Sequence, residues 1–193
     1  MLEAEAIRYA RWAEKFEWWY ENLALKLRRF ILANSILDVG CGSGLLMRGL
    51  SKAFPRATIV GVDRSLYMCR SSRAVRGDEG ALPFRGGAFD LVVFSYSLRE
   101  PHLLQTLLEA RRVLKEGGII AVRDVNSEAP QFIKDLIVAL IERNVSKRYA
   151  EEVRSLLKRF PSPGSLVKTV GTLFEVLHFS STILGFDLVG RKR

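Results

Sequence analysis

Apolar runs and helical apolar stripes alternate along most of the chain. Continuous apolar runs lie at 36–39, 57–63, 89–95 and 119–122, and apolar residues at helical spacing follow each of them. A strand that is buried on both faces of a parallel sheet is typically such a continuous run, whereas a helix repeats its apolar residues every three or four positions. The alternation predicts an α/β fold with a mostly parallel sheet and helices on both faces.

The two ends of the chain depart from this alternation. Residues 1–34 carry a helical stripe that is unusually rich in aromatic residues, and we expect either a lid over a ligand pocket or a helix packed on the domain. Two further helices and a short third one are predicted within 127–173. Residues 174–183 and 186–190 are predicted to form an antiparallel hairpin, because only a short connection joins them.

A glycine-rich turn follows the first predicted strand. Gly40, Gly42 and Gly44 occupy alternate positions directly after that strand, and a helical stripe comes next. Such a turn brings the backbone and a helix N-terminus close to a ligand. The dinucleotide fingerprint requires glycine at its sixth position, where this chain has Leu45. Asp38 would also repel a pyrophosphate, so the turn favours a cationic ligand.

A second carboxylate, Asp63, ends the next strand about 20 residues further on, where an acidic residue can accept hydrogen bonds from ribose hydroxyls. This spacing is common to proteins that bind NAD and to proteins that bind S-adenosylmethionine (SAM). Asp63 is also well placed to cap a helix over 65–74. Arg64 either lies against an adenine or is one of many exposed arginines.

Several motifs resemble those of class I SAM-dependent methyltransferases, in particular the small, single-domain, ubiquinone-biosynthesis-like (type 11) members. They are Asp38-Val-Gly-Cys-Gly-Ser-Gly44, Gly77-Asp-Glu-Gly-Ala-Leu-Pro-Phe84, Phe89-Asp-Leu-Val92, Arg111-Arg-Val-Leu-Lys-Glu-Gly-Gly118, an aromatic segment at 9–20 and the C-terminal residues 186–192. The resemblance implies a Rossmann-like sheet of seven strands with an antiparallel C-terminal strand, in one domain over 1–193.

The same resemblance implies a cofactor site. SAM would be the cofactor, S-adenosylhomocysteine the product, Asp78 the acceptor for the adenine amino group and Glu79 a backbone donor to the ring. The implied cofactor-binding residues are Asp38, Gly40, Cys41, Gly42, Gly44, Asp63, Arg64, Asp78, Glu79 and Ser95.

The chain departs from the family pattern at several places. Phe16-Glu17 stands where relatives usually carry Tyr-Asp, so no polar role is assigned to Phe16, and the helical insertion over 127–173 resembles nothing in the family. Ser95-Tyr-Ser-Leu-Arg-Glu-Pro101 is not the Asn-Pro-Pro-Tyr segment typical of enzymes that methylate amino groups of bases. His102 is either a general base or an exposed residue at a helix start. No metal site is predicted.

Charge and composition bear on partners and environment. The chain has 193 residues, a net charge of +9 and an isoelectric point near 9.9. The basic helix predicted over 149–160 is expected to be a solvated cap that covers a small-molecule acceptor, because its aromatic residues share the apolar stripe and so point inward. RNA is the alternative acceptor. We expect no membrane span and no secretory leader. Cys41 and Cys69 lack the spacing of metal or redox sites, which predicts free thiols in a reducing cytoplasm. The scarcity of Asn and Gln favours a thermophilic source.

The function that these observations predict is methyl transfer from SAM to an unidentified acceptor. Two other classes stay open: a SAM-binding subunit without activity, and an NAD-dependent oxidoreductase, which Leu45, Asp38 and the terminal hairpin oppose. The sequence does not determine the acceptor, the oligomeric state or whether a general base is used.

Overall fold

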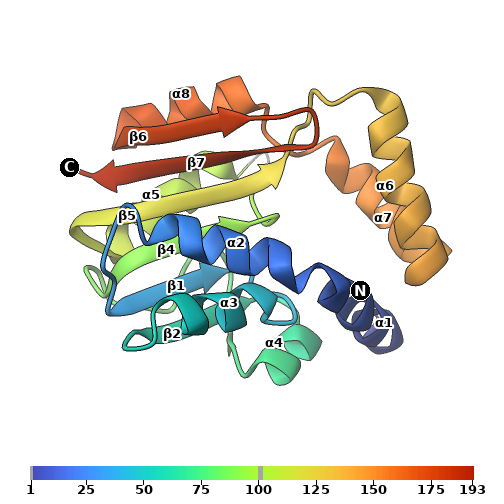
Figure 1. Cartoon of the computed structure of the whole chain (residues 1–193), viewed down its shortest axis with the longest axis horizontal. Helices are drawn as coiled ribbons and strands as arrows, with labels where there is room; N and C mark the ends of the chain where they lie inside the picture. The colour runs from blue at the N-terminus through green and yellow to red at the C-terminus, as the bar shows by residue number, and fades with distance from the viewer. Residues whose placement is uncertain (1, 100–101) are drawn as a thin grey trace.

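A seven-stranded sheet forms the centre of the structure, a computed structural model that describes residues 2–99 and 102–193 (Figure 1). The strand order is β3-β2-β1-β4-β5-β7-β6. The strands are β1 (Ser35–Val39), β2 (Thr58–Asp63), β3 (Val75–Arg76), β4 (Phe89–Ser95), β5 (Leu114–Val125), β6 (Phe174–Ser181) and β7 (Gly185–Lys192).

The strand directions confirm the fold class expected from the sequence. Strands β3, β2, β1, β4 and β5 pair in parallel, and β7 runs antiparallel to both β5 and β6. In a sheet of this kind, ligands bind beyond the carboxyl ends of the parallel strands. The sheet therefore brings the ends of β1, β2 and β4 together at one edge, where the glycine turn and Asp63 lie.

Helices cover both faces of the sheet. Helices α2 (Glu17–Leu27) and α3 (Leu45–Ala53) share an apolar cluster with Ile36, Leu91 and Ile119. On the opposite face, α5 (Leu103–Val113) and α8 (Pro163–Leu173) share a cluster with the neighbouring strand residues Leu37 and Val92. Successive side chains of a strand point to opposite faces, so apolar residues at adjacent positions supply both layers.

The N-terminal segment is not the single helix predicted over 1–34. Helix α1 (Glu3–Ala13) ends in a short 3-10 turn at Glu14–Phe16, α2 follows, and residues 28–34 form turns and irregular structure. The break lets the two helices serve different surfaces: α2 packs on α3, whereas α1 contacts α4 (Leu66–Ser72) and α6 (Gln131–Asn144). Sequence periodicity continues across the break because both helices bury an apolar stripe.

The region over 127–173 divides into two parts. Helices α6 and α7 (Lys147–Leu157) pack on each other beyond the carboxyl ends of β4 and β5, whereas α8 returns to cover the sheet (Figure 1). Helix α5 ends at Val113, whereas its apolar stripe of Leu103, Leu107, Ala110 and Leu114 predicts an end at Gly117. The backbone N–H groups of Gly87 and Ala88 donate hydrogen bonds to the last carbonyls of α5, and β5 starts at Leu114.

Among the described residues, no helix is long and apolar enough to cross a membrane.

Adjacent leucines on α5 provide a test of the packing. Leu107 is fully buried in the cluster beneath the sheet, whereas Leu108 is about half exposed. We expect Leu107→Ala to lower the free energy of unfolding by about 2–5 kcal/mol, since it removes apolar contacts and leaves a cavity. Leu108→Ala, the control, should change it by less than about 1 kcal/mol. Urea denaturation followed by circular dichroism measures both, and equal losses would contradict the placement of α5.

Candidate functional site

A cavity of about 590 Å³ lies at the carboxyl ends of β1, β2 and β4. Its walls come from strand ends, from α4 and from two helices remote in sequence, α1 and α7. The lining residues are Tyr9, Val39, Gly40, Gly42, Val62, Asp63, Arg64, Ser65, Leu66, Tyr67, Met68, Gly77, Glu79, Tyr96, Ser97, Arg99, Tyr149, Glu152 and Leu156.

The glycine turn forms the floor of this cavity. Gly40 and Gly42 adopt φ of +73° and +51°, a region that non-glycine residues rarely occupy. A Cβ on Gly40 would lie 2.4 Å from the Cβ of Ser97, so only glycine fits there. A Cβ on Gly42 would meet no atom within 4 Å, because this backbone faces open space. The turn thus exposes backbone to a ligand at Gly42.

Asp63 joins this turn to the next strand and helix. One carboxylate oxygen accepts a hydrogen bond from the Gly42 N–H at 3.0 Å, and the other accepts from the Ser65 N–H at 2.8 Å. Asp63 also lines the cavity. It does not cap α4 as one reading of the sequence expected, because Ser65 occupies the N-cap position and the Asp63 carboxylate bonds the N–H of Ser65 rather than an N–H within the helix.

A smaller chamber of about 80 Å³ adjoins the main cavity, with which it shares Tyr9, Gly40, Gly42 and Tyr96. It is lined by Tyr9, Tyr20, Asp38, Gly40, Cys41, Gly42, Ser43, Leu45, Leu46, Ser95 and Tyr96. Two of its polar atoms, Oδ2 of Asp38 and Oγ of Ser95, are buried and have no hydrogen-bond partner among the described residues. Buried polar atoms are rarely left unpaired in folded proteins, so both atoms are available to a ligand.

Burial raises the pKa of Asp38 to about 8, and the negative charge of Asp63 contributes to the shift. Burial likewise raises the pKa of Tyr96 to about 12, and it raises the pKa of Tyr9 and of Tyr20. An anionic Asp38 is therefore costly in the empty chamber, and a cation bound beside it would relieve the cost.

Tyr96 holds an unusual backbone conformation between the two cavities, with φ of +59°. Its hydroxyl accepts a hydrogen bond from Nε1 of Trp19 at 2.7 Å, and its carbonyl accepts one from Arg99 at 2.8 Å. Such conformations persist where surrounding contacts enforce them. In this chain those contacts come from α2 and from the loop after β4.

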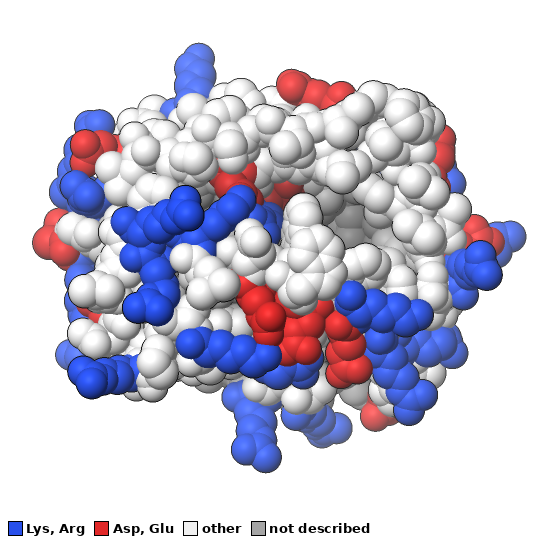
Figure 2. Space-filling view, viewed as in Figure 1, with Lys and Arg blue, Asp and Glu red and all other residues white. Residues whose placement is uncertain are grey.

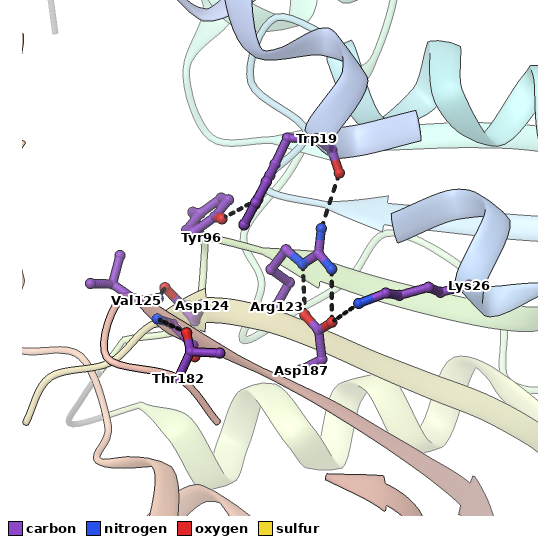
Figure 3. Close-up of polar contacts among 9 residues, drawn as sticks. Trp19, Lys26, Tyr96, Arg123, Asp124, Val125, Thr182 and Asp187 are labelled. Atoms are coloured by element: carbon purple, nitrogen blue, oxygen red, sulfur yellow. Dashed lines mark hydrogen bonds and ion pairs between the residues drawn. The ribbon is translucent and has the colours of Figure 1, made fainter. Parts of the chain in front are cut away.

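A buried ion pair supports Trp19 from below (Figure 3). The Arg123 guanidinium binds Asp187 through two hydrogen bonds of 2.6 and 2.7 Å and donates a third, at 3.0 Å, to the backbone carbonyl of Trp19. Lys26 also contacts Asp187, at 3.2 Å. The pair thus links β5 and β7 to α2 and positions the helix that supplies Tyr20 to the small chamber.

Arg99 is fixed in the wall of the main cavity. It donates hydrogen bonds to the carbonyls of Tyr96 and Leu98, and its guanidinium carbon lies 4.0 Å from the ring centroid of Phe160. Oδ2 of the fully buried Asp124 lies 3.9 Å from Arg99. Burial raises the pKa of Asp124 to about 7 although Arg99 opposes the shift. Arg99 thus brings a positive charge to a cavity whose other walls carry Asp63, Glu79 and Glu152.

The structure brings most of the predicted cofactor-binding residues to the two cavities. Asp38, Cys41 and Ser95 line the small chamber, Arg64 and Glu79 line the large one, Asp63 lies in the large one, and Gly40 and Gly42 line both. These placements agree with the predicted site without testing whether each residue binds a ligand. Cys41 and Cys69 are buried and free, as the sequence predicts.

Gly44, Asp78 and His102 lie outside both sets of lining residues. A Cβ on Gly44 would lie 3.0 Å from the Cβ of Ser72, so this glycine permits close packing on α4. The Asp78 carboxylate accepts a hydrogen bond from the Gly80 N–H within its own loop, at 2.8 Å. His102 is exposed at the start of α5. Glu100 and Pro101 of the predicted segment after β4 lie outside the described residues.

Sequence reasoning gave no site role to several residues that line the cavities, among them Tyr20, Tyr96, Arg99, Tyr149 and Glu152. The aromatic stripe at 9–20 was a partial signal, because Tyr9 and Tyr20 belong to it. No local pattern marks Arg99 or Glu152, because their position depends on how the α6–α7 pair packs against the sheet edge.

Comparison with known families finds a match for the centre of the chain. Residues 37–122 match the family model of the methyltransferase domain. This central part of the chain is therefore similar to that family. The matched segment runs from β1 to β5 and includes the glycine turn, Asp63 and Ser95. The fold, the motifs and this match agree with the SAM-dependent methyltransferase class that the sequence resembles.

Two curated relatives have names that specify different acceptors. A demethylmenaquinone methyltransferase of Lactococcus lactis is 38% identical over 98 residues, which cover 44% of this chain and 39% of the relative. A malonyl-[acyl-carrier protein] O-methyltransferase of Coxiella burnetii is 33% identical over 104 residues, which cover 52% of this chain and 36% of the relative. The alignments thus span less than half the length of either relative.

Solved structures share the fold of the methyltransferase domain over nearly the whole chain. One chain, from a complex between the Haloferax volcanii Trm112 methyltransferase activator and a methyltransferase, aligns with a TM-score of 0.77 and 18% identity, covering 98% of this chain and 96% of that one. A SAM-dependent methyltransferase of Aquifex aeolicus aligns with a TM-score of 0.66 and 16% identity, covering 89% and 93%. The [4+2]-cyclase SpnF also aligns, with a TM-score of 0.66. The fold alone therefore does not decide the reaction.

The raised pKa of Asp38 predicts how stability depends on pH. Between about pH 4, where the carboxyl ionises in the unfolded chain, and about pH 8, where it ionises in the folded chain, the folded state binds more protons. Stability should therefore fall as the pH rises through this window. We expect Asp38→Asn to unfold with about 2–5 kcal/mol more free energy than the parent at pH 8.5, and with an excess of only about 1–2 kcal/mol at pH 5, which lies one pH unit into the window.

Urea denaturation at the two pH values measures this difference. Asp135→Asn provides the control, because Asp135 is half exposed and its ion pair with Arg154 lies at the surface; its effect should stay below about 1 kcal/mol at both pH values. If Asp38→Asn leaves the pH dependence unchanged, the carboxylate is not buried in the way the structure describes.

Proposed function

We propose that this chain transfers a methyl group from SAM to a small-molecule acceptor and releases S-adenosylhomocysteine. The observation that carries the proposal is the pair of buried, unpartnered oxygens of Asp38 and Ser95 in a chamber beside the glycine turn. The family match over 37–122 supports the same reaction class.

The residues present fit this cofactor. SAM carries an ammonium and a sulfonium, and both favour a chamber that offers Asp38 and the rings of Tyr9, Tyr20 and Tyr96. The adenosine would occupy the large cavity, with Asp63 as the acceptor for the ribose hydroxyls and Glu79 near the base. Arg64 lies at the exposed rim of the same cavity. Asp78 would need its loop to rearrange before it could bind the adenine amino group, because its carboxylate bonds Gly80.

When bound, SAM supplies an electrophilic methyl group on a positively charged sulfur. The chain's own tasks are to orient this group and to exclude water. Helices α1 and α7 serve the second task, since Tyr9 and Tyr149 pack edge to face above the cavity, with ring centroids 5.8 Å apart. We assign no general base, because His102 is exposed and lies outside both cavities.

The cavity favours a small acceptor over a polymer. One wall of the large cavity is formed by Arg99, Tyr149 and Leu156. This wall offers aromatic and apolar surface with one cation. The two relatives are named for demethylmenaquinone and for a malonyl group on acyl-carrier protein, and neither acceptor is carried over to this chain.

RNA is the second candidate acceptor, because six cations lie between Arg143 and Arg159. Single-stranded RNA is usually bound by aromatic side chains that stack on its bases. In this chain Phe160 is buried beneath Arg99, and Tyr149 packs on Tyr9. These aromatics therefore point inward, which supports a small molecule over RNA.

Asp63, whose side chain lines the large cavity, provides the test of cofactor binding. We expect Asp63→Asn to weaken SAM binding by about 1.5–3 kcal/mol, or roughly 10- to 150-fold, because buried ribose hydroxyls would lose a charged acceptor. Isothermal titration calorimetry measures the affinity, and the thermal midpoint confirms that the variant folds. Asp135→Asn is the matched control and should bind SAM like the parent. Equal affinities of Asp63→Asn and the parent, or binding of NADH without binding of SAM, would refute the proposal.

Retention on immobilised total RNA separates the two acceptor classes. At about 0.15 M salt, where surface charges are screened beyond about 8 Å, we expect weak retention that falls further with added salt. The variant Arg154→Glu/Lys158→Glu/Arg159→Glu should retain SAM binding. Tight RNA retention by the parent that this variant loses would instead make RNA the acceptor.

A further inference from the structure

Helix α6 is apolar on two opposite sides. Val138 and Ile141 are buried in the cluster that α6 forms with α7. Phe132, Leu136 and Leu140 recur every four residues on the other side, and their exposed fractions are 66%, 55% and 42%. A contiguous exposed apolar patch on a protein surface commonly marks an interaction site. The chain covers only one side of α6 among its described residues.

The exposed side has a definite shape. Residues four apart on a helix lie on one face, so Phe132, Leu136 and Leu140 form a continuous line, and Ala139 is exposed beside it. We call these four residues the α6 outer face. Arg143 follows three positions after Leu140 and is exposed at the end of the line.

A second apolar element lies near the start of α6. Ile183 and Leu184, both half exposed, form the tip of the β6–β7 turn. Asn126, just before the segment that leads into α6, donates hydrogen bonds to the carbonyls of Thr182 and Leu184 at 3.0 and 3.2 Å. Figure 2 shows a broad white area over α6 and this turn, with charged side chains at its edges.

Two exposed cations lie at one end of the face. Residues 131–159 contain seven basic and four acidic side chains, but Lys134, Arg154 and Lys158 line the groove between α6 and α7, on the other side of α6. Of the acidic ones, Asp135 pairs with Arg154 at 2.8 Å, while Glu142 is exposed near the face. Arg143 and Lys147 are exposed where α6 ends and α7 begins. Cations that border an apolar helix face complement an anionic surface.

We propose that the α6 outer face binds the surface of a lipid bilayer that contains anionic headgroups. The apolar line would enter the boundary between headgroups and acyl chains, as interfacial helices do, and Arg143 and Lys147 would contact the headgroups. A second copy of the chain is a poorer occupant, because two chains of charge +9 would bring like charges together around the contact. The proposal does not depend on the methyltransferase reaction.

Co-sedimentation with vesicles tests this proposal on the full chain. One set of vesicles contains equal amounts of phosphatidylglycerol and phosphatidylcholine, and the other contains phosphatidylcholine alone. We expect the parent to partition onto the anionic vesicles and less onto the neutral ones, with binding that falls as salt is added. Phe132→Gln/Leu136→Gln should lower the partition coefficient at least about tenfold, because it removes the apolar line with a good helix former.

Helix α5 supplies a matched control. Leu104 and Leu108 are also four residues apart and about half exposed, so Leu104→Gln/Leu108→Gln removes two exposed apolar side chains elsewhere and should bind like the parent. Equal binding by the two double variants, or no preference for anionic vesicles, would overturn the proposal. So would a parent dimer in light scattering that the α6 variant alone converts to a monomer, since the face would then belong to a second copy. SAM affinity is measured on the same variants, so a failure of vesicle binding can be told apart from a failure of the proposed methyltransferase function.

Discussion

The glycine turn after β1 keeps its shape through one carboxylate. Asp63 accepts hydrogen bonds from the N–H groups of Gly42 and Ser65, so it ties the turn, the end of β2 and the start of α4 into one unit. Each of these N–H groups would otherwise need another partner. The floor of the large cavity, the position of Gly42 and the direction of α4 all depend on this arrangement.

The distribution of charge sets the cavity apart from the rest of the molecule. The chain carries a net charge of +9, yet Asp38 and Asp63 face the two cavities at the end of the sheet. An excess of surface arginine and lysine discourages binding of cations elsewhere, whereas the buried Asp38 is stabilised when a cation comes near. The lining of the two cavities, with four carboxylates and two arginines, is thus acidic within a basic protein.

The large cavity is built from two layers of structure. The sheet with α2, α3, α5 and α8 presents the strand ends, while α1 and α7 close the cavity from outside. An ion pair between Arg148 and Glu5 joins these two outer helices and lowers the pKa of Glu5 to about 2. Because relatives that share the sheet are named for different acceptors and even for a cyclase, the outer layer is where differences in substrate can arise.

The sequence by itself determined four strands of the parallel core (β1, β2, β4 and β5), the terminal hairpin and the carboxylates beside the glycine turn. These features depend on local patterns, since strand burial, turn glycines and helical stripes are each encoded within a few neighbouring residues. Only the tertiary structure decided where the N-terminal helix breaks, that Asp38 and Ser95 face a chamber without protein partners, and that Tyr9, Tyr20 and Tyr96 enclose that chamber. Those features arise from contacts between segments far apart in the chain, such as the hydrogen bond from Trp19 to Tyr96, and no local pattern records which distant residue will fill a given space.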